Sequence, residues 1–250
     1  MRKYDHLFFD LDNTLLDFTA NSRLAMKQML DQNNILPKSI AFDDFFKVYE
    51  QINKSLWSDY HFKKITKQEL IVERFSRSLL VFGITDMDWK EINHHYLENM
   101  AIQTGLYPNT LETLGILRSR GYLMYIITNG FREVQRAKLA NCGLDGFFTK
   151  VFISEELQTT KPHRKIFEHA LKSTNASKMK SIMIGDSWET DIAGALDFGM
   201  DQIMFLNGGL HELPREIESK LSTANATCLE LKPQIRTYFI DEIPDLITIL

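Results

Sequence analysis

Continuous apolar runs recur along the chain and predict strands that are buried on both faces. The runs lie at 7–9, 122–128, 150–154, 181–185 and 202–206, and 237–240 is expected to be a last strand. Between them, apolar residues recur three and four positions apart, which predicts helices at 109–120, 131–141, 165–174 and 189–198, and a closing helix at 243–250. Alternating strands and helices predict an α/β fold with a Rossmann-like parallel sheet.

One long interval breaks this alternation. Between the first and second apolar runs, helical spacing appears at 21–30, 42–57, 67–83 and 88–100, with no buried strand among them. A gap of this length between two sheet strands favours an inserted domain over a loop. We therefore expect a core formed by residues 1–17 and 103–250, and an inserted α-helical domain at 18–102.

Composition narrows the possible partners and compartment. Apolar residues make up 44% and charged residues 25% of the 250 positions, as in an ordinary globular protein. The net charge of -4 and the mixed signs along the chain disfavour duplex nucleic acid as a partner. The two cysteines, Cys142 and Cys228, lack CxxC spacing, which favours a reducing cytoplasm. Apolar runs too short to cross a bilayer predict no membrane segment.

Polar residues that could bind ligands or take part in catalysis follow the predicted strands. In an open parallel sheet, ligands bind beyond the carboxyl ends of the strands, so these residues are expected to converge. Clustered carboxylates without histidine or thiolate favour Mg²⁺. A hydroxyl, backbone amides and a lysine beside them would bind a phosphoryl group. The residues in question are Asp10, Asp12, Thr128, Asn129, Gly130, Lys161, Asp186, Ser187 and Asp191.

Each of these pieces also has an ordinary structural interpretation. Asp12-Asn13 and Thr128-Asn129-Gly130 are common turn sequences. Asp186 and Asp191 could serve only to begin a helix, and a single lysine is usually a surface charge. Their joint order at successive strand ends favours the functional interpretation. A zinc site is disfavoured because the seven histidines form no HxxxH pair.

Four motifs in this order resemble those of the haloacid dehalogenase-like hydrolases that act as aspartyl-phosphate-forming phosphatases. They are DLDNT at 10–14, IITNG at 126–130, TKP at 160–162 and GDSWETD at 185–191. The helical insertion resembles the α-helical cap of this superfamily. The stretches GDSWETDIAGA and TYFIDEIPDL are similar to the branch that holds bacterial pyrimidine-type nucleotidases.

The resemblance implies a role for each motif residue. Asp10 would be the nucleophile, and Asp12 would protonate the leaving oxygen and then activate water. Thr128, the Asn129 amide and Lys161 would bind the phosphoryl oxygens. The Asp10 carboxylate, the Asp12 main-chain carbonyl and Asp186 would bind Mg²⁺, the expected cofactor. Ser187 and Asp191 would not bind the metal directly but would orient the groups that do.

Three positions depart from the family pattern. Asn13 stands where many relatives have glycine, Ser187 where a second acid is common, and His163 where another acid is common. Asparagine tolerates a positive φ angle, and a serine hydroxyl can bind a metal-bound water, so activity is expected to persist. The part that the loop around His163 plays stays open.

The leading hypothesis is a Mg²⁺-dependent phosphomonoester hydrolase acting on a small phosphorylated metabolite, with a nucleoside monophosphate as substrate. The alternatives are a sugar-phosphate or other metabolite phosphatase, a sugar-phosphate mutase, a 2-haloacid dehalogenase and a catalytically silent interaction module. The oligomeric state, monomer or homodimer, stays open. Aromatic residues of the insertion are expected to form its core rather than to stack on a base: Phe45, Phe46, Trp57, Tyr60 and Phe62.

Overall fold

The computed structural model describes residues 2–209, 213–224 and 227–250, and in these residues seven strands form one sheet. The strand order is β3-β2-β1-β4-β5-β7-β6, and every neighbouring pair is parallel except β6 and β7. The predicted α/β fold with a Rossmann-like parallel core is confirmed. The strands are β1 (His6–Phe9), β2 (Leu123–Thr128), β3 (Lys150–Ile153), β4 (Ser181–Gly185), β5 (Asp201–Phe205), β6 (Cys228–Lys232) and β7 (Ile235–Ile240).

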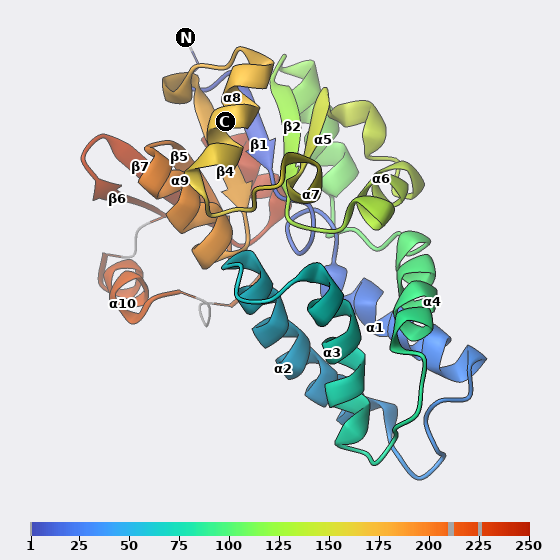
Figure 1. Ribbon diagram of the computed structural model, residues 1–250. Coiled ribbons are helices and arrows are strands. Elements are labelled where there is room, and N and C mark those ends of the chain that lie inside the picture. The colour runs from blue at the N-terminus through green and yellow to red at the C-terminus, as the bar shows by residue number, and fades with distance from the viewer. Residues whose placement is uncertain (1, 210–212, 225–226) are drawn as a thin grey trace.

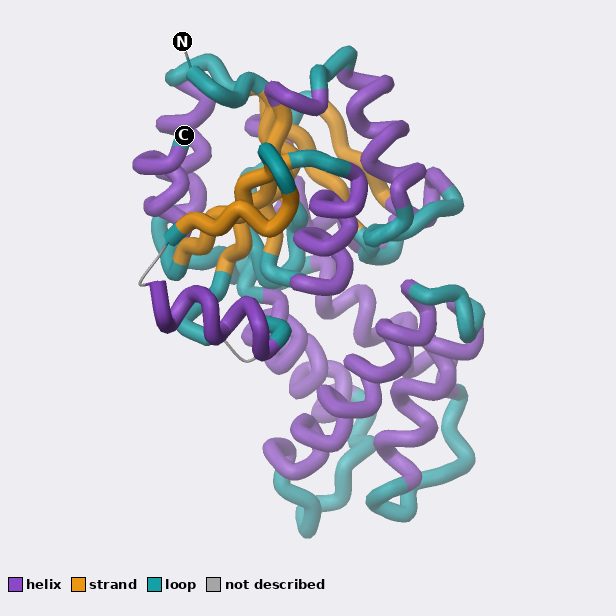
Figure 2. The backbone as a smooth tube through the Cα atoms, turned by 90° about the vertical axis from the view of Figure 1, so that its left-hand side faces the viewer, coloured by secondary structure: helices purple, strands orange, loops and turns teal. Residues whose placement is uncertain are grey.

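Helices cover both faces of the sheet (Figure 2). In β1, Leu7 and Phe9 enter one apolar cluster and Phe8 enters another, as the twofold period of a strand requires. The first cluster packs against α5 (Thr110–Ser119), α6 (Arg132–Asn141) and α11 (Leu246–Ile249), and the second against α8 (Arg164–Thr174) and α9 (Ala193–Phe198). Burial on both faces explains why these strands read as continuous apolar runs.

A bundle of four helices is inserted between β1 and β2, as predicted (Figure 1). Its members are α1 (Phe18–Gln32), α2 (Phe42–His61), α3 (Lys67–Leu80) and α4 (Trp89–Ala101). The bundle has an apolar core of its own, to which each helix contributes buried residues such as Met26, Phe45, Phe75 and Tyr96. We call this bundle the cap, because it lies beyond the carboxyl ends of the strands (Figure 1).

The two chain segments that join the cap to the sheet are hydrogen-bonded to each other. The N–H of Asp17 donates to the carbonyl of Gly105 at 3.1 Å, and the N–H of Tyr107 donates to the carbonyl of Leu15 at 3.0 Å. A β-bridge between Leu16 and Leu106 lies between these two bonds. The connection is therefore a short two-stranded ribbon rather than two separate linkers.

A second contact between cap and core is ionic. At the start of α3, the Lys67 ammonium lies 2.8 Å from a carboxylate oxygen of Glu133 on α6 and 2.7 Å from one of Glu155 on α7 (Ser154–Leu157). The same ammonium lies 4.4 Å from the centre of the Phe131 ring. Cap and core thus meet through ion pairs and a cation–π contact.

Several elements differ from the predicted ones. No element was predicted at 207–236, where the structure has β6 and α10 (Arg215–Ala224). Most residues of β6 are only half-buried, so it lacks the continuous apolar run of the central strands. The helix predicted at 189–198 begins as a π-helix at Trp188–Ile192, and the closing helix is a 3₁₀ turn, Ile243–Asp245, followed by α11. Within the described segments, no helix is long and apolar enough to span a membrane.

Candidate active site

The predicted site residues gather around one cavity between the sheet and the cap. Asp10 directly follows β1, Thr128 ends β2, and Asp186 directly follows β4. These three strands are neighbours and parallel, so their carboxyl ends meet at one edge. The cavity has a volume of about 760 Å³. It is lined from the core by Asp10, Asp12, Thr128, Asn129, Lys161 and Asp186, and from α2 of the cap by Asn53, Trp57 and His61 among others.

Lys161 lies at the centre of the charged groups. Its ammonium forms an ion pair with Asp10 and another with Asp191 at 2.6 Å, and the residue is 1% exposed. Burial alone would lower the pKa of Lys161, but the two carboxylates outweigh it and raise that pKa above its usual value. Lys161 is therefore a permanent cation that partly neutralises a buried pair of acids.

Three carboxylates crowd the same point. Oxygens of Asp10, Asp186 and Asp191 lie within 4.8 Å of one another. Burial and the neighbouring Asp191 charge raise the pKa of Asp10 to about 7, although Lys161 opposes this. Burial and the charges of Asp10 and Asp191 raise the pKa of Asp186 well above its usual range. A cation bound among these oxygens would let all three ionise, so the donor set fits a hard divalent metal.

The predicted metal ligands Asp10 and Asp186 are thus brought together, and Thr14 adds a hydrogen bond of 3.1 Å to Asp186. Asp191 was predicted as a support. One of its oxygens pairs with Lys161, and the other accepts from the Ser187 N–H at 3.1 Å. Both carboxylate oxygens of Asp191 are therefore engaged by the protein.

Gly185 makes room for Asp191. A Cβ atom at position 185 would lie 2.3 Å from an Asp191 carboxylate oxygen, closer than any real contact. Glycine is required here by the close approach of the side chain that holds Lys161, and no positive φ angle is involved. The glycine of the last motif is thereby explained by packing.

Asn129 fixes the loop that carries Lys161. Its side-chain amide donates to the Lys161 carbonyl at 3.0 Å, and its side-chain oxygen accepts from the Lys161 N–H at 2.9 Å. The sequence had suggested only a role for the Asn129 main-chain amide. The side-chain role was missed because the two residues are 32 positions apart and no local pattern links them.

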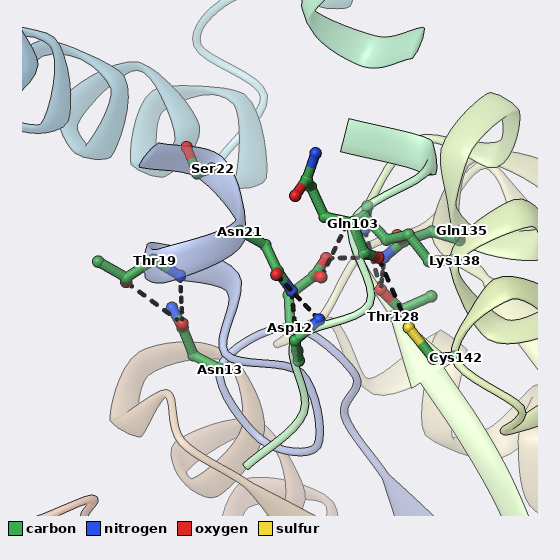
Figure 3. Close-up of polar contacts among 12 residues, drawn as sticks. Asp12, Asn13, Thr19, Asn21, Ser22, Gln103, Thr128, Gln135, Lys138 and Cys142 are labelled. Atoms are coloured by element: carbon green, nitrogen blue, oxygen red, sulfur yellow. Dashed lines mark hydrogen bonds and ion pairs between the residues drawn. The ribbon is translucent and has the colours of Figure 1, made fainter. Parts of the chain in front are cut away.

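The hydroxyl oxygen of Thr128 accepts two hydrogen bonds. One comes from the Gly130 N–H at 3.1 Å and one from the Gln135 side-chain amide at 2.6 Å (Figure 3). With its oxygen so occupied, the hydroxyl has its single proton to donate to a ligand. Gly130 is also needed for space, because a Cβ there would lie 2.1 Å from the Gln135 amide nitrogen.

Asp12 is held by two residues of α6 (Figure 3). The Lys138 ammonium lies 2.8 Å from one oxygen of its carboxylate, and the Gln135 amide donates to the other at 2.9 Å. Both partners are buried, and neither was predicted. The available signal was their place on the inward face of a predicted helix, in line with the apolar residues Val134 and Leu139.

The three departures from the family pattern have structural explanations. Asn13 adopts a φ of 60°, and its side-chain oxygen accepts from the Thr19 N–H at 3.2 Å where α1 begins (Figure 3). The Ser187 hydroxyl accepts from the Thr190 N–H at 3.3 Å and caps the π-helix. His163 is exposed at the start of α8 and does not line the cavity.

The cap aromatics lie in three environments. Phe45 and Phe46 are buried in the cap core, and Phe62 is 46% exposed at the surface. Tyr60 packs against Phe131 of the core domain, whereas Trp57 packs there and also lines the cavity. Trp57 is the one member of the predicted set among the residues that line this cavity.

Comparisons with known proteins give a consistent assignment. The family model "haloacid dehalogenase-like hydrolase" matches residues 4–199. The pyrimidine 5'-nucleotidase PynA of Streptococcus pneumoniae is 39% identical over 81% of this chain and 84% of its own. A glyceraldehyde 3-phosphate phosphatase of Methanothermobacter thermautotrophicus is 31% identical over 84% and 88%. The crystal structure of YfnB from Bacillus subtilis, described as a putative HAD-hydrolase bound to magnesium, superposes with a TM-score of 0.82 at 27% identity, covering 100% of this chain and 99% of that one.

Replacing Gly185 tests the packing behind Lys161. We expect Gly185→Ala to lower the free energy of unfolding by about 1–3 kcal/mol, because the added methyl must displace Asp191. The matched control is Gly115→Ala in α5, where nothing lies within 4 Å of the new Cβ. That variant should gain up to about 1 kcal/mol from helix propensity. Urea unfolding measures both, and equal effects of the two variants would contradict the clash.

Proposed function

This chain belongs to the haloacid dehalogenase-like hydrolases, and from that premise we propose that it is a Mg²⁺-dependent phosphomonoester hydrolase working through an aspartyl phosphate. The observation that carries the proposal is the arrangement of two acids at one strand end. Asp10 contacts Lys161 inside a cluster suited to a metal, while Asp12 faces the same cavity with partners of its own. One acid is thereby available for attack and the other for proton transfer.

In the proposed reaction, a carboxylate oxygen of Asp10 attacks phosphorus and the ester P–O bond breaks. The leaving oxygen takes a proton from the Asp12 carboxyl group. Asp12, now ionised, removes a proton from a water molecule that attacks the phosphorus of the aspartyl phosphate. The bond between phosphorus and Asp10 then breaks, so the products are the alcohol and inorganic phosphate.

The remaining residues bind and orient the phosphoryl group. Thr128 donates its hydroxyl proton, the Asn129 amide donates from the main chain, and Lys161 supplies positive charge. We propose that Asp10, Asp186 and the main-chain carbonyl of Asp12 hold Mg²⁺, with Ser187 and Asp191 in support. The ion, when bound, would neutralise the charge that builds on the phosphoryl oxygens.

For the substrate we propose a nucleoside monophosphate. PynA, whose name gives pyrimidine nucleotides as its substrates, supports this, and so does a cavity of about 760 Å³, within the usual size range of ligand pockets. The archaeal relative named for glyceraldehyde 3-phosphate makes a small sugar phosphate the second candidate. Asp12 and Asp186 argue against a dehalogenase, and the complete set of site residues argues against a silent module.

The same proposal includes the domain division and the compartment. We assign residues 1–17 and 103–250 to the catalytic core and 18–102 to the cap. These boundaries lie at the start of α1 and just after the end of α4. A cytoplasmic location is supported by Cys142 and Cys228, both of which are free thiols.

The nucleophile is tested with Asp10→Asn. Phosphate release from nucleoside monophosphates and sugar phosphates is expected to fall by more than about a thousandfold, because the amide cannot form the covalent intermediate. The exposed residue Asp145, changed in the same way, should leave turnover unchanged. Circular dichroism checks that both variants fold. Undiminished hydrolysis by Asp10→Asn would refute the assignment.

The metal site is tested without turnover, by thermal unfolding. The raised pKa values of Asp10, about 7, and Asp186 mean that the folded metal-free chain holds protons which the unfolded chain releases near pH 4. Its stability therefore declines as pH rises through about 7. Mg²⁺ at about 100 times its Kd should raise Tm by roughly 5–10 °C at pH 8, and by less at pH 5. The gain should vanish in Asp186→Asn, and an equal gain in that variant would exclude Asp186 as a ligand.

The positioning of Asp12 by its ion pair with Lys138 is tested with Lys138→Met. Loss of the ammonium 2.8 Å from Asp12 should lower kcat by about ten- to a hundredfold, because the acid is no longer held in position. Lys165→Met on the exposed side of α8 is the control. Steady-state kinetics with the same substrate gives kcat and KM separately. A change confined to KM would assign Lys138 to substrate binding instead.

A further inference from the structure

One face of α2 is directed into the cavity. Asn53, Trp57 and His61 are spaced four residues apart, which places them on the same side of the helix, and all three line the cavity. Figure 1 shows α2 running from the far end of the cap towards the sheet, with its C-terminal end nearest the strands. Distance from the phosphoryl end of the site therefore increases from His61 through Trp57 to Asn53.

Three polar atoms on this face are buried and lack a hydrogen-bond partner. Among the described residues, they are the hydroxyl of Tyr49, which also lines the cavity four residues before Asn53, the side-chain oxygen of Asn53 and Nε2 of His61. An unpaired buried polar atom destabilises the folded protein, so such atoms are normally satisfied. Three of them on residues of one helix face, all lining the cavity, indicate groups that a ligand satisfies.

His61 lies beside the phosphoryl end. Its carbonyl accepts from the Thr160 hydroxyl at 3.2 Å, and Thr160 directly precedes Lys161. Burial, with the Lys161 charge as a smaller cause, lowers the pKa of His61 to about 4. His61 is therefore a neutral hydrogen-bonding group close to the site of reaction.

The helical rise of α2 gives the distance along the cavity between His61 and Asn53. Asn53 is eight residues before His61, or about 12 Å along the helix axis at 1.5 Å per residue. A triose phosphate held at Lys161 would stay near His61. Only a longer leaving group reaches Asn53.

The chemistry between these two points suits a flat ring. Trp57 lies midway, and its ring has the aromatic neighbours Phe131, His61 and Tyr60, at 4.9, 5.4 and 5.7 Å between centroids. An aromatic surface next to a side-chain amide is the combination that stacks and hydrogen-bonds a nucleobase. A second phosphate fits less well, since the cap side of the cavity carries the acids Glu50 and Asp59 along with Lys54.

We propose that Asn53 and Trp57 bind the base of a nucleoside monophosphate, with the Asn53 amide on the base edge, the Trp57 ring against its face and His61 at the sugar. This inference rests on the proposed phosphatase function and adds the residues that select its substrate. Asn53 is the specificity-determining residue, because it combines an unpaired polar atom with a place far from the phosphate, whereas the ring of Tyr49 is buried in the cap core.

The experiment compares uridine 5'-monophosphate with ribose 5-phosphate, which lacks the base, in the wild type and in Asn53→Leu. We expect kcat/KM for the nucleotide to fall by about tenfold or more, and that for ribose 5-phosphate to stay within about twofold. Tm should not fall, because the substitution removes an unpaired buried oxygen. Calorimetry with uridine gives a second readout, in which binding should weaken in the variant.

The matched control is Asn21→Leu, also in the cap. The Asn21 side chain is fully engaged with Gly105, donating at 2.8 Å and accepting at 3.0 Å, and it does not line the cavity. This variant should lose stability while the ratio of the two kcat/KM values stays unchanged. The pair separates loss of base recognition from a general disturbance of the cap.

The remaining outcomes are distinct. If Asn53→Leu lowers both substrates equally, lowers neither, or loses stability as Asn21→Leu does, base recognition by Asn53 is wrong and the phosphatase proposal stands. If the wild type hydrolyses ribose 5-phosphate but not the nucleotide, the proposed base-binding site is wrong. The hypothesis that the substrate is a sugar phosphate is then favoured. If the wild type releases phosphate from no phosphomonoester, the proposed function fails and this inference fails with it.

Discussion

The buried ammonium of Lys161 is the constraint on which the rest of the site depends. Acids as close as Asp10 and Asp191 repel each other strongly in a medium of low polarity, and the lysine between them makes their burial tolerable. Much of the surrounding structure serves to hold this one side chain. Asn129 fixes its backbone from both sides, and Gly185 leaves the space in which Asp191 reaches it.

The two acids of the first motif lie two positions apart but have separate electrostatic surroundings. Asp10 shares Lys161 and is enclosed by other carboxylates, whereas Asp12 has Lys138 and an amide from a helix on the other side of the site. Each acid thus has its own positively charged partner, and the two lysines lie on different elements. Such separation suits a reaction that asks one carboxyl group to attack and its neighbour to carry protons.

Prediction from the sequence succeeded where a general rule of folds applies. Buried parallel strands read as apolar runs, and the polar residues after them must meet at one edge, so the placement of Asp10, Thr128 and Asp186 around one cavity could be predicted without a structure. It failed where a partner is distant along the chain and has no pattern of its own, as with the Asn129 side chain and Lys138. The half-buried strand β6 was missed because its hydrophobic pattern is weak. That the side-chain oxygen of Asn53 has no hydrogen-bond partner can be recognised only when all its neighbours are known.

The ribbon that joins cap and core also sets how the cap can move. Two separate linkers would let the bundle twist and slide, but segments hydrogen-bonded across Asp17 and Gly105, and across Leu15 and Tyr107, deform together. A paired ribbon bends far more easily than it shears, because shearing breaks its cross-strand bonds. The two segments therefore act as one hinge, and the ion pairs of Lys67 with Glu133 and Glu155 are a separate contact that must break before the cap can swing away from the core.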